Sequence, residues 1–448
     1  MTPKKVHYTG VCGTGMSALA QFDALSGLTV TGSDRSADRG EAQDAVARLA
    51  AVGVKVLPQD GSGVTPDALV VVSTAIESDN RDAQRARELG ARVVHRADYL
   101  AALAGARRTV AVAGTSGKST VTAMIFEILR AAGLDPSLIS GANLPSLRTR
   151  GLLGNAWLGK SDLLVIEADE SDGTLTRYRP ELGVLLNVSK DHKEVAELHA
   201  LFKEFRARCT RFVVSADASG LADYETGATT FGFSRGEFRG SDLQVHARGS
   251  SFRAGGAAFE LQVPGRYNAE NALAAAAAAR ELGVEAAASA QALKSFSGVA
   301  RRFQVVGAAR GVEVVDDFAH NPEKVAAALG AARLRSRRVL AVFQLHGFAP
   351  ARFMKEEFLD AFAKSLRPED ALYLPDIYYV GGTAAKDISS KDYAQALTAR
   401  GVRAFHRPDR GALAAELARE ARAGDLVLVM GARDASLTRL AEEVLARL

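Results

Sequence analysis

The chain has 448 residues, of which 47% are hydrophobic and 24% are charged. These values are ordinary for globular proteins, and the length predicts roughly two to four domains. The formal net charge is only +4, and no run of Lys and Arg is interleaved with aromatic residues. We therefore expect no nucleic-acid partner.

The cysteines and the apolar segments of the sequence indicate the cellular compartment in which we expect the protein. The two cysteines, Cys12 and Cys209, cannot form a disulfide framework or a Cys/His zinc site, which favours a reducing compartment. No apolar run reaches the about 18 residues that a membrane-spanning helix needs. The first residues also lack the apolar stretch of a signal peptide. We expect a cytoplasmic protein with no membrane insertion.

Short apolar runs alternate with amphipathic stretches, which predicts an α/β fold with parallel sheets. In a first domain we expect strands at 6–9, 28–31, 69–73 and 91–94 and a helix from about 15 to 26. In a second we expect strands at 109–113, 163–166 and 183–186, a helix to about 132, a small antiparallel patch at 242–263 and a helix at 268–282. In a third we expect strands at 312–315, 339–343, 371–374 and 426–430.

These elements predict three consecutive domains, at 1–105, 106–297 and 298–448. The first and third are expected to be Rossmann-like. The central domain is expected to be a P-loop ATPase-like domain, with the antiparallel patch added to its parallel sheet.

The segment GTSGKST at 114–120 follows an apolar strand and opens a helix, which is the context of a phosphate-binding loop. Its glycines let backbone N–H groups turn toward phosphate oxygens, and the helix N-terminus favours their negative charge. Lys118 is suited to the β- and γ-phosphates, and the hydroxyl of Ser119 to magnesium. Position 112, where the longer form of this motif begins with glycine, is Val112.

Polar groups follow the next two predicted strands of this domain. Four acids lie within EADESD at 167–172, beginning with Glu167, and His192 ends the segment NVSKDH at 187–192. The carboxyl edge of a parallel sheet is where such folds bind ligands, and magnesium prefers carboxylate oxygens. The sequence therefore predicts a magnesium site formed by Ser119, Glu167 and His192.

Gly10, Gly13 and Gly15 follow the first strand, and Asp34 ends the next one. This spacing is also typical of NAD-dependent oxidoreductases. That alternative leaves GTSGKST and the acidic segment without a role. If the central domain binds ATP, the same glycine turn is suited to a nucleotide diphosphate.

An ordered set of motifs resembles the Mur ligases over essentially the whole chain. The motifs are GVCGTGMS (10–17), TGSD (31–34), VSTAI (72–76), GTSGKST (114–120), EADESD (167–172), GRYNAEN (265–271), RRFQ (301–304) and DDFAHNP (316–322). The resemblance is strongest to the branch that adds L-alanine to UDP-N-acetylmuramate, with some features of the murein tripeptide recycling branch.

The resemblance implies an ATP-dependent, ADP-forming ligase of peptidoglycan precursor synthesis. A carboxylate of a UDP-N-acetylmuramate-type precursor would attack ATP, and the amine of an amino acid or short peptide would then attack the acyl phosphate. Lys118, Glu167, His192 and Arg302 would act in catalysis. ATP would be bound by Gly114, Thr115, Ser116, Gly117, Lys118, Ser119, Thr120, Asn268, Asn271, Arg302 and Asp317.

The family also implies two further binding sites. The UDP-linked precursor would be bound by Gly13, Thr14, Gly15, Met16, Asp34, Ser73 and Thr74. The acceptor would be bound by His320, Asn321, His346 and Arg352. His346 and Asp317 are candidates for taking the proton of the amine.

The third domain departs from the alanine-adding pattern. Gly347 and Pro350 stand where arginines are expected to hold the carboxylate of the amino acid, and Arg352 is the nearest substitute. Ser116 replaces a usual histidine, and Cys12 is similar to the recycling branch. The acceptor therefore stays open among L-alanine, the recycled tripeptide and another amine. A non-catalytic nucleotide-binding regulator is a further alternative, and the oligomeric state is open.

Overall fold

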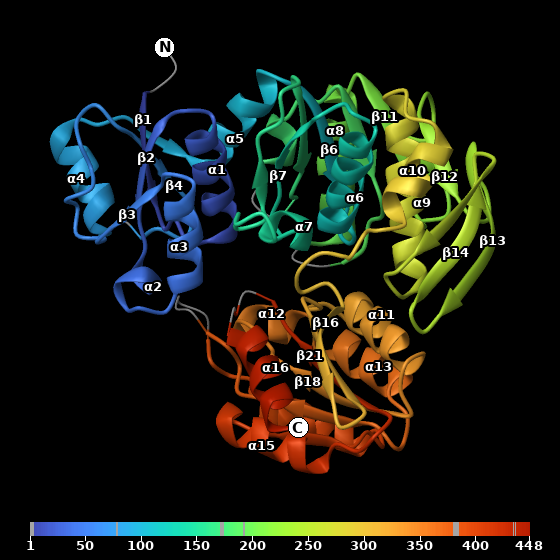
Figure 1. Ribbon diagram of the computed structural model, residues 1–448. Coiled ribbons are helices and arrows are strands. Elements are labelled where there is room, and N and C mark those ends of the chain that lie inside the picture. The colour runs from blue at the N-terminus through green and yellow to red at the C-terminus, as the bar shows by residue number, and fades with distance from the viewer. Residues whose placement is uncertain are drawn as a thin grey trace. The chain divides into compact units, whose positions relative to one another are not determined.

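The computed structural model describes residues 4–77, 79–170, 174–190, 193–379, 385–432, 434 and 436–448. It contains three separate sheets, which lie in the blue, the green to yellow and the orange to red parts of the chain in Figure 1. The α/β fold with three consecutive domains is confirmed. Residues 1–243, 251–261 and 269–299 form one compact unit, and 244–250, 262–268 and 300–448 form a second.

The first sheet is fully parallel, with the order β3-β2-β1-β4-β5. The direction of the order reverses beside β1, which creates a crevice at the carboxyl ends of β1 and β4. The strands are β1 (Lys5–Thr9), β2 (Thr29–Ser33), β3 (Lys55–Leu57), β4 (Leu69–Val72) and β5 (Val93–His95). The helices are α1 (Thr14–Leu25), α2 (Arg35–Asp38), α3 (Gln43–Ala51), α4 (Arg81–Leu89) and α5 (Arg96–Gly105).

The second sheet has the order β15-β14-β13-β12-β11-β10-β6-β9-β7-β8. Its strands are β6 (Arg108–Ala113), β7 (Ser137–Ile139), β8 (Ala156–Trp157), β9 (Leu163–Glu167), β10 (Leu182–Leu185), β11 (Arg211–Ser215), β12 (Thr229–Gly232), β13 (Phe238–His246), β14 (Gly249–Ala254) and β15 (Ala257–Leu261). Only two residues separate β13 from β14 and β14 from β15, so these neighbours run antiparallel. The expected patch is thus part of the central sheet.

The helices of this domain are α6 (Lys118–Ala131), α7 (Pro145–Arg148), α8 (Val195–Arg208), α9 (Arg266–Glu281) and α10 (Ala286–Leu293). Alanine makes up half of α9, and residues 272–279 are all buried. Small side chains let a helix approach a sheet closely, and alanine has the highest helix propensity. One apolar cluster joins the first sheet, α1 and the central sheet within the first unit.

The third sheet has the order β16-β17-β21-β18-β19-β20, with only β16 antiparallel to its neighbour. Its strands are β16 (Gln304–Ala309), β17 (Val312–Asp317), β18 (Arg338–Phe343), β19 (Ala371–Leu374), β20 (Ala404–His406) and β21 (Asp425–Met430). Its helices are α11 (Pro322–Arg333), α12 (Phe348–Phe353), α13 (Lys355–Ser365), α14 (Ser390–Ala399), α15 (Arg410–Glu420) and α16 (Ser436–Arg447).

Alternate residues of β18 belong to two apolar clusters. Val339 and Ala341 pack in one of them, and Leu340 and Val342 in the other. Both faces of this sheet are therefore covered, which explains why its strands read as continuous apolar runs.

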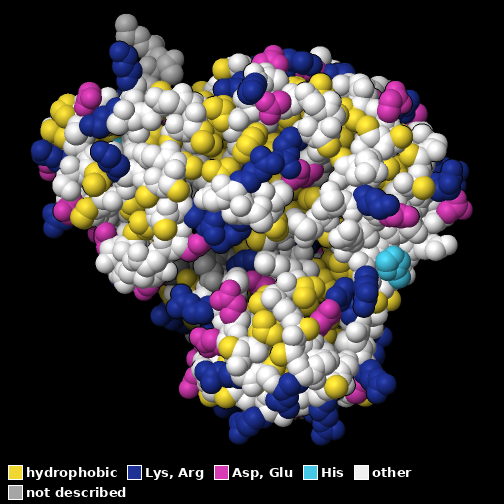
Figure 2. Space-filling model, viewed as in Figure 1, with side chains coloured by type: hydrophobic (Ala, Val, Ile, Leu, Met, Phe, Trp, Pro, Cys, Tyr) yellow, Lys and Arg dark blue, Asp and Glu magenta, His cyan; other side chains and the backbone are white. Residues whose placement is uncertain are grey.

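Two features concern the surface. Lys and Arg side chains are interspersed with Asp and Glu on the face that Figure 2 shows. In the described part of the chain, no helix has both the length and the apolar character that crossing a membrane requires.

Candidate active site

The phosphate loop connects β6 to α6 in the central domain. Gly114 and Gly117 have φ angles of +134° and +90°, which favour glycine strongly. A Cβ atom at Gly117 would lie 2.6 Å from Oδ1 of Asn271. The loop thus needs glycine at 117 both for its backbone angle and for the close approach of Asn271, which the sequence had assigned to ATP.

A residue without a role in the sequence prediction holds this loop. The backbone N–H of Ser116 donates to Oδ1 of Asn187 at 2.8 Å, and Nδ2 of Asn187 donates to the carbonyl of Ser116 at 3.0 Å. The hydroxyl of Thr115 donates to the carbonyl of Ser189 at 3.1 Å. Asn187 comes two residues after β10, which pairs with β6, so its place at the carboxyl edge was the available signal.

Lys118 opens α6, and its side chain is mostly buried. Its Nζ donates to the carbonyl of Gly114 and to Oε2 of Glu170, both at 2.7 Å, and Asp169 lies 4.0 Å away. Burial lowers the pKa of Lys118, but the negative charges of Glu170, Asp169 and Glu167 outweigh burial and raise the pKa above its ordinary value. Lys118 is therefore a fixed positive charge inside the phosphate loop.

Glu167 ends β9 with its carboxylate held on both oxygens. Oε2 accepts from the hydroxyl of Ser119 at 3.0 Å, and Oε1 accepts from the hydroxyl of Ser140 at 2.7 Å and from the N–H of Gly141 at 2.8 Å. The predicted magnesium ligands Ser119 and Glu167 thus touch. His192, the third, lies outside the described residues.

These oxygen donors fit magnesium, which commonly takes one or two protein ligands and completes its shell with phosphate and water. Within the described ranges, no group of three His, Cys, Asp or Glu side chains forms a metal-binding cluster. Ser119 and Glu167 would therefore depend on the phosphates of a nucleotide to complete the shell.

The predicted precursor site lies at the crevice of the first sheet. Gly13 precedes α1, and the side chain of Ile76, which follows β4, lies against Gly10 of the glycine turn. Asp34 is buried, and its Oδ2 accepts from the N–H of Cys12 at 2.9 Å. Thr14, Gly15 and Met16 open α1 after β1, and Ser73 and Thr74 directly follow β4, so both segments follow neighbouring strands at the same edge of the sheet.

In the second unit, Asp317 lies at the end of β17 beside the segment 301–304. Its Oδ2 accepts from the N–H of Phe303 at 2.6 Å, and its Oδ1 accepts from the N–H of Ala319 at 2.7 Å. Burial raises the pKa of Asp317 to about 6 against the lowering effect of Arg302. The guanidinium of Arg302 lies 4.6 Å from the centroid of the Phe318 ring.

The backbone of this segment is strained. Arg301 and Phe303 have φ angles of +58° and +50°, in the region that non-glycine residues rarely adopt. Strained backbone segments of this kind are often found at functional sites.

Asn268, at the start of α9, is buried and donates from Nδ2 to the carbonyl of Pro264 at 2.7 Å.

The predicted acceptor residues lie around β17, β18 and α11. The rings of His320 and His346 are edge to face with centroids 5.8 Å apart, beside a small pocket whose lining includes Leu345, Pro350 and Met354. Asn321 is the N-cap of α11, and its Oδ1 accepts from the N–H of Lys324 at 2.9 Å. Its side chain therefore has a structural role that the sequence prediction did not include.

Arg352 is the nearest candidate to replace the missing arginines, and the structure gives it partners within the protein. It is partly exposed, and its guanidinium is paired with the carboxylate of Asp387 and donates to the carbonyl of Ala385 at 3.0 Å. Gly347 has a φ of +71°, and a Cβ atom there would lie 3.2 Å from Cδ of Pro350. The loop is therefore shaped for glycine and proline, and an arginine at 347 would be strained.

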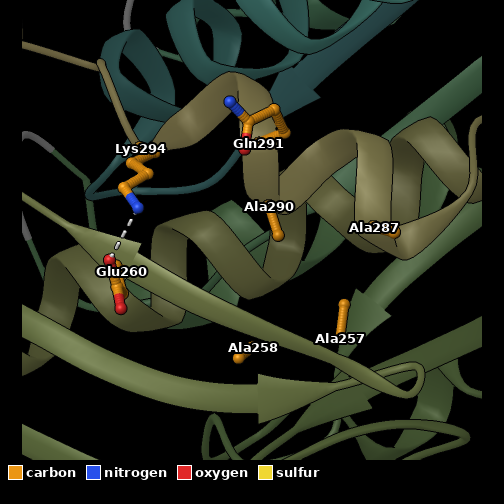
Figure 3. Close-up of a pocket in the computed structure, with 7 residues that line it drawn as sticks. All are labelled: Ala257, Ala258, Glu260, Ala287, Ala290, Gln291 and Lys294. Carbon is orange, nitrogen blue, oxygen red and sulfur yellow. Dashed lines mark ion pairs between the residues drawn. The ribbon is translucent and has the colours of Figure 1, made fainter.

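A separate pocket is lined by none of these groups. It lies between β15 and α10, with walls of small side chains and an ion pair of 3.2 Å between Glu260 and Lys294 (Figure 3). It contains no residue of the predicted sites.

The three parts of the chain match three families in sequence. Residues 5–108 match the Mur ligase family, catalytic domain, residues 112–279 match the Mur ligase middle domain, and residues 301–433 match the Mur ligase, glutamate ligase domain.

Curated relatives match over most of their length. The chain is 40% identical to a UDP-N-acetylmuramate–L-alanine ligase of Arthrobacter sp. (strain FB24), covering 89% of this chain and 86% of the relative. It is 39% identical to the enzyme of the same name from Paenarthrobacter aurescens, covering 96% and 94%.

Solved structures share the fold. The UDP-N-acetylmuramate–alanine ligase of Thermotoga maritima superposes with a TM-score of 0.82 at 24% identity, covering 99% of this chain and 98% of that one. A murein peptide ligase from Psychrobacter arcticus superposes with a TM-score of 0.72 at 23% identity, covering 99% and 98%.

The chain belongs to the Mur ligase family. It is an ADP-forming enzyme that uses ATP to make an amide bond in peptidoglycan precursor synthesis. The oxidoreductase alternative is thereby excluded, and the glycine turn after β1 belongs to a ligase.

Proposed function

We propose that the protein joins the carboxylate of UDP-N-acetylmuramate to the amine of an amino acid, with ATP and magnesium. The observation that carries this proposal is the loop in which Lys118 and the Ser119–Glu167 pair already lie beside each other. Phosphoryl transfer needs positioned charge more than covalent chemistry, and this loop supplies it.

We further propose that each domain binds one reactant. Residues 1–105 bind the UDP part of the precursor, 106–297 bind ATP, and 298–448 bind the acceptor. The crevice of the first sheet, the phosphate loop and the His320–His346 pair support this division.

In the mechanism that we propose, a carboxylate oxygen of the precursor attacks the γ-phosphorus of ATP, and ADP leaves. The amine then attacks the carbonyl of the acyl phosphate, phosphate leaves, and the nitrogen loses a proton to form the amide. Lys118 stabilises the charge that develops on the phosphate oxygens, and Arg302 is proposed to add a second positive charge.

Ser119 and Glu167, with His192 as a further candidate, are the residues that would bind magnesium. The metal would neutralise phosphate charge during the transfer. Asn268, Asn271 and Asp317 are proposed to complete the nucleotide site.

L-Alanine is the first candidate acceptor. The relatives at 34–40% identity are named for L-alanine addition. The pocket beside His346 is small and mostly apolar, which suits a methyl side chain. ATP and nucleotide-linked precursors are cytoplasmic compounds, so we propose the cytoplasm as the location.

A second candidate is a ligase for another amine, including the recycled tripeptide. It is favoured by the loop at 347–352, where Gly347 cannot readily become arginine and Arg352 is paired with Asp387. An acceptor without a free carboxylate at this position would need no arginine there.

The two candidates are separated by incubating the protein with ATP, magnesium and UDP-N-acetylmuramate and one acceptor at a time, with the product identified by mass. We expect an amide product with L-alanine. A product with only another amine would establish the second candidate. Absence of an amide product with every acceptor would contradict both candidates.

A further inference from the structure

A buried amide network connects the glycine turn of the first sheet to the central domain. Asn155 lies just before β8, and its side chain is fully buried. Its Nδ2 donates to the carbonyl of Thr14 at 2.8 Å and to the hydroxyl of Ser17 at 2.9 Å. Its Oδ1 accepts from Nε2 of Gln21 at 2.6 Å.

Gln21 fixes the orientation of the Asn155 amide. Its Nε2 also donates to the carbonyl of Ser17 at 3.1 Å, and its Oε1 accepts from the N–H of Leu153 at 3.1 Å. In the side-chain amides of both Asn155 and Gln21, the two N–H donors and the oxygen are therefore all hydrogen-bonded. Fully satisfied buried networks of this kind fix one arrangement of the chain. Helix α1, which carries Thr14, Ser17 and Gln21, lies against β7 and β8.

The hydrogen bond from Nδ2 of Asn155 holds the backbone carbonyl of Thr14, the first residue of α1 after the glycine turn. The peptide unit between Thr14 and Gly15 is planar and trans, so its carbonyl and its N–H point in opposite directions. Fixing the carbonyl of Thr14 therefore fixes the direction of the N–H of Gly15. That N–H belongs to the first turn of α1, where N–H groups lack helical partners and favour an anion.

We propose that Asn155 is a positioning residue, which aims the first backbone N–H groups of α1 at the diphosphate of the UDP-linked precursor. This inference rests on the proposed function, because it assigns the turn to a nucleotide diphosphate. Asn155 comes from the central domain, so the domain that binds ATP also sets the geometry of the precursor site.

The chain offers a matched control in Arg48 of α3. Its Nη1 donates to the carbonyl of Arg148 at 3.2 Å and to that of Leu152 at 3.0 Å. Arg48 thus connects the first domain to the same segment of the central domain through two hydrogen bonds, but its bonds do not reach the glycine turn. A general loosening of this contact would appear in an Arg48 variant as well.

The test compares Asn155→Ala, Asn155→Asp and Arg48→Met with the wild-type protein. Calorimetry gives the Kd for UDP and for UMP, and kinetics gives the KM for ATP. Asn155→Asp keeps the volume and the bond from Gln21 but removes both donors, so it serves if Asn155→Ala does not fold. Thermal unfolding of each variant records any general loss of stability.

We expect both Asn155 variants to raise the Kd for UDP by about 10-fold, which is the usual size of a lost buried hydrogen bond. The Kd for UMP should rise clearly less, and the KM for ATP should change less than about twofold. Arg48→Met should bind UDP like the wild type.

An unchanged Kd for UDP in a folded Asn155 variant would overturn the positioning role alone. An equal rise in Arg48→Met would also overturn it, because the effect would then come from the domain contact as a whole. Wild-type protein that binds ATP but not UDP would overturn the proposed function, and this inference with it.

Discussion

Lys118 is surrounded by acceptors before a nucleotide arrives. The carbonyl of Gly114 and the carboxylate of Glu170 bind its ammonium group, which keeps the charge inside the loop. Glu170 therefore acts as an internal counterion, which keeps a buried ammonium group from being unpaired.

Lys118→Ala is expected to abolish ATP turnover while the fold stays intact. Removal of a positioned charge from a phosphoryl-transfer site costs about 100-fold or more in rate. Phosphate release and thermal unfolding measure the two effects. Lys160→Ala is the control, since Lys160 is exposed and its side chain belongs to no predicted site. Ligation at a near-normal rate by folded Lys118→Ala would contradict the assignment of the loop.

At the scale of residues, the sequence predicted the groups that bear charge better than those that orient them. Lys118, Ser119 and Glu167 were expected together, because strand ends of a parallel sheet share one edge. Asn187 was not expected to hold the loop, because its bonds go to the backbone of Ser116 and depend on the exact path of both segments. Backbone contacts of this kind leave no pattern in side-chain chemistry.

At the scale of elements, the loop between β18 and α12 distinguishes this chain from the alanine-adding pattern. Gly347 is left-handed and directly precedes α12, and the chain is crowded there by Pro350. A loop that holds an arginine at 347 would need another backbone conformation. Glycine at 347 in place of arginine therefore changes the shape of this loop as well as its charge.

Gly347→Arg is expected to destabilise the protein by about 1–3 kcal/mol, the cost of a non-glycine residue in this conformation. It should also fail to increase turnover with L-alanine. Thermal unfolding and the rate of amide formation measure the two effects.

Gly330→Arg is the matched control for this prediction. Gly330 lies in α11 with open space around it, so arginine should be neutral or stabilising there. A Gly347→Arg protein that is as stable as the wild type and faster with L-alanine would show that the loop readily adopts the arginine-bearing conformation.

Elements with strong apolar runs were predicted within one or two residues, as for β19 and β6. The strands β3, β7, β8 and β20 were missed, because two or three residues are too few to show a period. The strand β16 was missed because it is largely uncovered and contains small residues. The strands β11 and β12 were also missed, and β11 has five residues that are mostly buried, so length and burial do not account for every missed strand.

At the scale of the whole molecule, the candidate groups are divided between two compact units. Lys118 and Glu167 belong to the first, and Asp317, His320 and His346 belong to the second. In the mechanism proposed above, the acyl phosphate must be kept from water until the amine attacks it. The order of the motifs along the chain predicted three consecutive α/β parts, but the contacts of Gln21 and Asn155 come only from the fold.

The central claim is that a carboxylate of the precursor attacks ATP at the phosphate loop. It is tested most directly with UDP-N-acetylmuramate whose carboxylate carries ¹⁸O, together with ATP, magnesium and the acceptor that the screen identifies. We expect each released phosphate to contain one oxygen from that carboxylate, because the amine displaces the phosphate with the bridging oxygen attached. Amide formation with unlabelled phosphate would contradict the account, since the carboxylate would then not have attacked the phosphorus.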